Sequence, residues 1–155
     1  VGTFPLPDSQ LDRFLLSISL GFPEPEVERE LLVAQDRREV LGRTRAELSP
    51  ADVLELQRQC TEVHVSDALL DYVQALLAAT RSSRWFETGL SPRAGIALLR
   101  CARAYAFIDD RDFVAPEDVK AVFPALARHR MTVAQGMELT VDDQISEMLR
   151  QVEIP

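Results

Sequence analysis

The stretch GLSPRAGIALLR, residues 89–100, has the composition of a helix start. Ser91 is a favourable N-cap, and Pro92 suits the first helical position because it has no N–H group to leave unpaired. The pattern predicts a helix from Pro92 to about Ile108. Arg93 is the anomaly, because it places a cation in the first turn, where free backbone N–H groups and the helix dipole favour anions.

Four other predicted helix starts follow the usual rule. Each has an acidic residue in or beside its first turn: Asp52 after Ser49, Asp67 after Ser66, Glu117 and Asp118 after Pro116, and Asp142 and Asp143 after Thr140. Such an acid stabilises a helix by roughly 0.3–1 kcal/mol. The start at Ser91 has no acid, so Arg93 is a specific exception within this chain.

The residues alone leave two interpretations of Arg93 open. In the first, its side chain projects into solvent or pairs with a carboxylate such as Glu87, at a cost of roughly a few tenths of a kcal/mol. In the second, the guanidinium and the N–H groups at the Ser91 end of the helix bind an anion, with phosphate as the best match. The chain has no GxxxxGK[ST] loop and no apolar strand ending in paired acids that could hold Mg²⁺.

The composition sets limits on the function. The chain has 155 residues, of which 46% are hydrophobic and 27% charged, as expected for one domain or a domain with part of another. Its net charge of −8 disfavours a nucleic-acid-binding module but permits a local basic site. Cys60 and Cys101 are predicted to be reduced core thiols, with a disulfide as the alternative. No apolar run approaches the roughly 20 residues that span a bilayer, and a cytoplasmic location is expected.

Downstream of residue 22 the pattern is almost entirely helical. Besides the helix at Pro92, helices are predicted within residues 24–42, 48–60, 65–82, 115–130 and 140–152. Pro124 is expected to kink or divide one of them. Residues 62–67 and 136–140 are predicted to add two short strand-like segments. The predicted fold class is therefore mainly α, a helical bundle with short strand segments.

The first 22 residues differ from the rest. A proline-punctuated loop leads into a short helical turn with Asp8 as its expected N-cap. Residues Leu15–Leu20 then alternate as a strand does, up to Gly21. A single strand cannot satisfy its own backbone donors and acceptors, so this segment is predicted to belong to a sheet that lies outside the chain.

Apolar residues at helical spacing are predicted to form the core. They are Val27, Leu31 and Ala34; Leu69, Val73, Leu76 and Leu77; Ala94, Leu98, Cys101, Tyr105 and Ile108; and Val119, Val122, Phe123 and Leu126. Trp85 and Phe86 are expected to anchor their loop in the bundle, and His64 is expected to point outward. The basic run at 128–130 is predicted to cap a helix C-terminus, with a contact to another subunit as the alternative.

Three stretches together resemble the C-terminal portion of a MoxR-type AAA+ ATPase: GTFPLPDSQLDRFLLSISLGFP, GLSPRAGIALLRCARAYAFIDDRDFVAPEDVKAVFPALARHR and the tail ISEMLRQVEIP. The resemblance covers essentially the whole chain. It implies that residues 23–155 are the helical lid domain. Residues 1–22 would be the C-terminal remnant of the α/β ATPase core, including its last strand.

The resemblance also implies roles for particular residues. Arg93 falls on the sensor-2 arginine, which contacts the γ-phosphate of ATP, and Ser91 places the helix N-terminus near that phosphate. Arg13, in QLDRF, falls on the arginine finger that is presented to the ATP of the adjacent subunit. The P-loop and the acids that bind Mg²⁺ are expected upstream of Val1, so the fragment alone is expected neither to bind nor to hydrolyse ATP. Whether Arg93 acts on its own subunit's ATP or a neighbour's stays open.

The resemblance further implies a chaperone-like ring, expected to be a hexamer, that remodels or matures client proteins, among them proteins with von Willebrand factor A-type domains. The alternative from another functional class is a helical adaptor that binds a protein partner and no nucleotide. A nucleic-acid motor is a third possibility, which the net charge of −8 disfavours.

Overall fold

The computed structural model describes residues 4, 6–34, 41–82, 86–134 and 139–154. Contacts between Cα atoms divide the chain into two compact units: residues 1–17 together with 58–155, and residues 18–57. The proposed division into a core remnant, 1–22, and a lid, 23–155, stays a prediction.

The described part of the chain is helical. Its elements are α1 (Asp8–Leu11), α2 (Pro25–Val33), α4 (Pro50–Glu62), α5 (Asp67–Ser82), α6 (Pro92–Ile108), α7 (Pro116–Ala127) and α8 (Val141–Gln151). The described residues form no strand, only two isolated bridges, His64 with Phe113 and Phe86 with Val133. The mainly α class is confirmed. The strand-like segment at 62–67 is reduced to one bridged residue, and residues 136–138 of the second segment lie outside the described residues.

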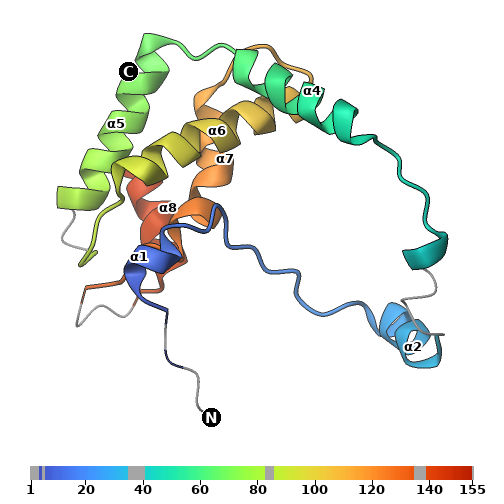
Figure 1. Cartoon of the computed structure of the whole chain (residues 1–155). Coiled ribbons are helices and arrows are strands. Elements are labelled where there is room, and N and C mark those ends of the chain that lie inside the picture. Colours follow the sequence, from blue (N-terminus) through green and yellow to red (C-terminus); the bar gives the residue numbers. More distant parts are fainter. Residues whose placement is uncertain (1–3, 5, 35–40, 83–85, 135–138, 155) are drawn as a thin grey trace. The chain divides into compact units, whose positions relative to one another are not determined.

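Helices α5 to α8 share the core of the larger unit. α6 packs chiefly against α7, and α7 also contacts α5 and α8 (Figure 1). Fully buried side chains come from all four helices: Tyr72, Leu76, Leu98, Val119, Phe123, Leu126 and Ile145. This core supports the N-terminal end of α6, where the anomalous arginine lies.

The buried face of α6 differs from the predicted one in its second half. Tyr105 and Ile108 were predicted to be buried, but they are 47% and 84% exposed. The buried positions instead continue from Leu98 through Ala102 and Ala106, at a spacing of four residues. Alanines on this face allow the close approach of a neighbouring helix, so the size of the side chains, and not only their apolarity, selects the face.

The apolar stripe of α2 is not buried either. Val27 and Leu31 are 48% and 46% exposed, and Ala34, just after the helix, is also exposed. No described residue between 18 and 57 is buried. The prediction of core packing for this helix is therefore wrong for the described structure, because the unit of residues 18–57 gathers no core of its own.

Pro124 does not divide α7, so of the two predicted effects, a kink or a division, the division is wrong. The helix continues to Ala127, and the backbone N–H of Arg128 donates to the carbonyl of Pro124 at 3.0 Å. Proline removes one helical hydrogen bond. The side chains on either side of it, Phe123 and Leu126, are fully buried, so tertiary packing holds the helix together across the break in its hydrogen bonds.

The expected caps are present except at α1. The hydroxyls of Ser49, Ser66 and Thr140 accept from backbone N–H groups at 3.2 Å each. Asp8 is the first residue of α1 and not its N-cap, a position that Pro7 occupies without a side-chain hydrogen bond. The hydrogen bonds from Ser49 lower the pKa of the Asp52 carboxyl.

Residues 14–22 are extended without a described partner strand. The first of these residues are held by the end of α7: the N–H of Ser17 donates to the carbonyl of Ala125 at 2.8 Å, and the carbonyls of Phe14 and Leu15 accept from side chains that follow α7. Ile18, Leu20 and Phe22 are 72%, 92% and 98% exposed. The extended conformation agrees with the prediction of a strand that lacks its sheet.

Other expectations concern single side chains. Phe86 is buried and His64 is exposed, as expected, whereas Trp85 lies outside the described residues. Cys60 and Cys101 are both free thiols, as predicted, but only Cys101 belongs to the core, whereas Cys60 is half-buried. Burial raises the pKa of Cys101. Within the described ranges, no helix has the length and apolarity of a membrane span.

Candidate functional site

The N-terminal end of α6 is fixed by contacts with α5. The Oγ of Ser91 accepts from the N–H of Ala94 at 3.1 Å, which confirms Ser91 as the N-cap. Leu90, which is 2% exposed, donates its N–H to Thr80 Oγ1 at 3.1 Å, and its carbonyl accepts from Arg81 Nε at 2.9 Å. The residue before the cap therefore has both of its backbone polar groups bonded to α5, which sets where the helix begins.

Gly89 is required by the same close approach. A Cβ at this position would lie 2.6 Å from the Cα of Arg81, and backbone atoms cannot move aside as a flexible side chain can. A Cβ at Gly95 would meet the end of the flexible Leu77 side chain, with Cδ1 nearest at 2.7 Å. The first glycine of GLSPRAG thus allows the loop to pack against α5.

Arg93 lies exposed in the first turn of α6, which contains no acid. No described carboxylate lies within ion-pair distance of its guanidinium, so the pairing with Glu87 is not formed. The geometry therefore excludes the carboxylate pair and leaves a solvated side chain or an anion-binding one.

Arg13 follows α1 and is also exposed without a described ion-pair partner. The structure brings Arg13 and Arg93 to one pocket of about 300 Å³, which Arg100 and Arg130 also line. The remaining lining residues are Asp12, Leu15, Ile96 and Ala97. Four guanidiniums and one carboxylate give the pocket a strong excess of positive charge, which suits an anion.

Arg100 was not singled out from the sequence. It lies seven residues after Arg93, two helical turns along the same face of α6, and its guanidinium has no described ion-pair partner. The seven-residue spacing is visible in the sequence. It indicates a shared site only together with the structure, in which Arg13 lines the same pocket as Arg93 and Arg100.

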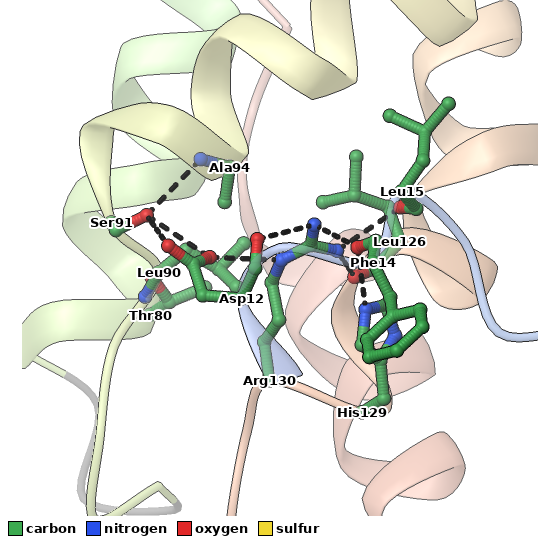
Figure 2. Close-up of polar contacts among 10 residues, drawn as sticks. All are labelled: Asp12, Phe14, Leu15, Thr80, Leu90, Ser91, Ala94, Leu126, His129 and Arg130. Atoms are coloured by element: carbon green, nitrogen blue, oxygen red, sulfur yellow. Dashed lines mark hydrogen bonds and ion pairs between the residues drawn. The ribbon is translucent and has the colours of Figure 1, made fainter. Parts of the chain in front are cut away.

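A hydrogen-bond network connects the two segments that carry Arg13 and Arg93 (Figure 2). Ser91 Oγ donates to the carboxylate of Asp12, lying 3.0 Å from Oδ2 and 3.2 Å from Oδ1. Arg130 Nε donates to the same carboxylate, at 3.0 Å from Oδ1. Asp12 therefore lies between the N-cap of α6 and an arginine that follows α7.

Arg130 uses all of its guanidinium nitrogens. Besides the Asp12 carboxylate, its acceptors are the backbone carbonyls of Asp12, Phe14, Leu15 and Leu126. Its side chain is only 4% exposed. The bond to Leu126 bears out the prediction of a cap at the end of α7, whereas the contacts with residues 12–15 were not foreseen, because nothing in the local sequence connects positions 118 residues apart.

The chemistry of the pocket favours phosphate over metal. Guanidinium donors match phosphate oxygens and do not coordinate cations. The described residues contain no group of three or more His, Cys, Asp or Glu side chains arranged to hold a metal ion. The arrangement can bind and neutralise an oxyanion.

Comparisons with known proteins concern the fold and the family of the chain. Residues 78–148 match the model of the AAA lid domain. The chain is 35% identical over 170 residues to chaperone MoxR1 of Mycobacterium tuberculosis, and 31% identical over 157 residues to the uncharacterized protein YeaC of Bacillus subtilis. These alignments cover 99% of this chain but 44% and 49% of the two relatives.

A solved structure gives the same result. The crystal structure of a proposed ATPase from Cytophaga hutchinsonii matches with a TM-score of 0.84 and 32% identity, over 100% of this chain and 51% of that one. The chain thus spans about half the length of the relatives it matches. From the lid-domain match, the MoxR relatives and this structural agreement, the chain belongs to the MoxR family of AAA+ ATPases and contains their lid domain.

Proposed function

We propose that this chain supplies the arginines with which a MoxR-type ATPase stabilises the transferred phosphoryl group of ATP. Arg13 acts as the arginine finger and Arg93 as the sensor-2 residue. The observation that carries the proposal is that Arg13 and Arg93 line one arginine-rich pocket and that neither has a described carboxylate within ion-pair distance; the carboxylate of Asp12, which also lines the pocket, is paired with Arg130.

The chemistry follows from the charge that develops during hydrolysis. Phosphoryl transfer spreads negative charge over the phosphate oxygens, and a well-placed arginine raises the rate by roughly 10³–10⁵-fold in comparable enzymes. The N–H groups at the Ser91 end of α6 add partial positive charge at the same place. Arg100, lining the same pocket, increases the positive potential further.

The shared pocket also bears on whose ATP is contacted. A phosphate that touches both Arg13 and Arg93 belongs to a single nucleotide. The family resemblance assigns Arg13 to the nucleotide of the adjacent subunit. We therefore place Arg93 in trans as well, in a ring that we take to be hexameric.

The complete protein would couple this chemistry to the remodelling of other proteins in the cytoplasm. One relative is named a chaperone, and proteins with von Willebrand factor A-type domains are the clients that the resemblance suggests. ATP and Mg²⁺ would be held chiefly by a P-loop and acidic residues that this chain does not contain. The chain alone is therefore proposed to be inactive.

The test is ATP turnover by the complete protein. Arg13→Ala and Arg93→Ala should each lower kcat at least about 100-fold, since each removes charge stabilisation from the transition state. Circular dichroism should stay unchanged, because both side chains are exposed. Arg150→Ala, at an exposed arginine of α8, is the matched control and should keep its activity. Wild-type turnover in either pocket variant would remove that residue from the mechanism and favour the adaptor interpretation.

A further inference from the structure

We propose that Arg130 is a positioning residue, which fixes residues 12–15 against the start of α6 so that Arg13 and Arg93 are held in register. The proposal rests on the proposed function of the arginine pocket. It assigns to Arg130 no contact with the nucleotide: its effect on catalysis passes through the two exposed arginines.

The donors of Arg130 are fully used within the protein. A guanidinium has five N–H groups, and Arg130 has five acceptors, four of which belong to residues 12–15. The fifth is the carbonyl of Leu126 in α7. Although Arg130 lines the pocket, it has no donor left for a ligand, which distinguishes it from Arg13, Arg93 and Arg100.

Asp12 connects the segments that carry the two functional arginines through its side-chain hydrogen bonds. It directly precedes Arg13, and its carboxylate accepts from Ser91, which precedes Arg93 by two residues. Arg130 holds the same carboxylate from the other side, at 3.0 Å (Figure 2). A shift of Asp12 would therefore move Arg13 relative to the first turn of α6.

Besides the hydrogen bond from Ser91 to Asp12, two other contacts hold the segment near the helices without Arg130. The ring Nε2 of His129 lies 3.0 Å from the carbonyl of Phe14, and the N–H of Ser17 donates to the carbonyl of Ala125 at 2.8 Å. These contacts involve other groups and stay possible in an Arg130 variant. We expect such a variant to fold with a loosened segment, since the main core among α5, α6, α7 and α8 is untouched.

Arginine is required here by geometry as well as by charge. Lysine carries the same charge but only three N–H donors on one nitrogen, so it cannot reach acceptors spread around a planar fork. Arg130→Lys should therefore behave more like Arg130→Ala than like the wild type. A role limited to neutralising Asp12 would predict the opposite.

The experiment measures ATP turnover of the complete protein in a mutant cycle. Arg130→Ala and Arg130→Lys should each lower kcat about 10-fold or more with little change in KM. In the Arg13→Ala/Arg93→Ala background, adding Arg130→Ala should change kcat less than 2-fold, because the groups that it positions are gone. Arg128→Ala, which breaks a neighbouring ion pair with Asp142 in α8, is the control and should keep wild-type turnover.

The outcomes separate the two proposals. Turnover that is unchanged in Arg130→Ala, or reduced by the same factor in both backgrounds, overturns the positioning role while Arg13 and Arg93 stay essential. Wild-type turnover in the Arg13 and Arg93 variants overturns the proposed function and, with it, this inference. Hydrogen exchange gives an independent reading: the amide of Ser17 should exchange faster in Arg130→Ala than in Arg128→Ala, and equal rates contradict the loosened segment.

Discussion

Arginines near the two ends of α6 differ in whether their guanidinium groups are paired with a carboxylate. Near its N-terminal end, Arg13, Arg93 and Arg100 line a pocket and have no ion-pair partner among the described residues. Beyond its C-terminal end, Arg111 binds the carboxylate of Asp118 through Nη1 and Nη2, at 2.7 and 2.5 Å.

Arg111, the paired arginine, stabilises the fold. Asp118 is 2% exposed and also accepts from the N–H of Ala115 at 2.7 Å, so it caps α7 as it binds Arg111. Arg111 further donates to Asp109 at 3.2 Å. The contrast teaches that arginines whose donors are satisfied internally stabilise the protein, whereas those left unmatched in a pocket are available to a ligand. Arg130 belongs to the first class although it lies beside the second.

The largest difference between the ends should appear in stability. Arg111→Ala leaves the buried Asp118 without its guanidinium, so we expect the melting temperature of the chain to fall by roughly 5–10 °C. Arg93→Ala removes an exposed side chain that has no described partner, so its melting temperature should stay near that of the wild type. Thermal unfolding followed by circular dichroism measures both. Equal melting temperatures for the two variants would contradict the claim that Arg111 stabilises the fold and Arg93 does not.

The loop that precedes α6 should be destabilised when a single methyl group is added at Gly89. Gly89→Ala places a Cβ against the backbone of Arg81, and we expect a loss of about 1–3 kcal/mol in the free energy of unfolding. Gly42→Ala is the control, because a Cβ there would meet nothing within 4 Å. Urea unfolding of the two variants decides the point. A loop that rearranges freely would give both variants the same stability.

The ion pair between Arg111 and Asp118 should make the free energy of unfolding depend on pH in the acid range. The hydrogen bonds from Arg111 lower the pKa of Asp118 below its ordinary value of 3.8, although burial opposes them. The stabilisation is therefore present above that ordinary value and is lost as the pH falls through the lower pKa of the folded state. Asp118→Asn should be less stable than the wild type at pH 7, and the gap should narrow below about pH 4. Unfolding across this range measures the gap, with the exposed Asp71→Asn as a control for net charge. A gap independent of pH contradicts the pairing.

The smallest effect should be a gain in stability. Arg93→Glu replaces a cation with an anion in the first turn of α6, which the helix dipole favours by roughly 0.3–1 kcal/mol. The same substitution should abolish most ATP turnover in the complete protein, because it removes the proposed phosphate ligand. Urea unfolding of the chain and a turnover assay of the complete protein give the two readings. A variant that loses stability would show that the arginine is there for structural reasons.

Local signals predicted the helices well. Pro92 and Ile108 bound α6 as expected, and Ser91 caps it. Such features depend on neighbours in the sequence. The buried face of the second half of α6 was misjudged, because alanines at 102 and 106 form the packing surface instead of Tyr105 and Ile108.

The candidate site was predictable only in part. Arg93 was identified by a charge of the wrong sign, and Arg13 by family resemblance alone. Their shared pocket depends on contacts between Arg130 and residues 12–15, which local periodicity cannot encode. Because opposite charges far apart in a sequence have many possible partners, only the folded chain shows which ones meet.

The extended segment that follows the pocket has a practical consequence for handling the isolated chain. Ile18, Leu20 and Phe22 alternate with polar or small residues and are largely exposed. This pattern favours the pairing of strands from separate molecules and therefore aggregation. Pro23 and Pro25 follow at once, and neither can donate an N–H to such a ladder. We expect these prolines to limit the length of the aggregation-prone stretch, so that a few residues outside the core govern the solubility of the chain at high concentration.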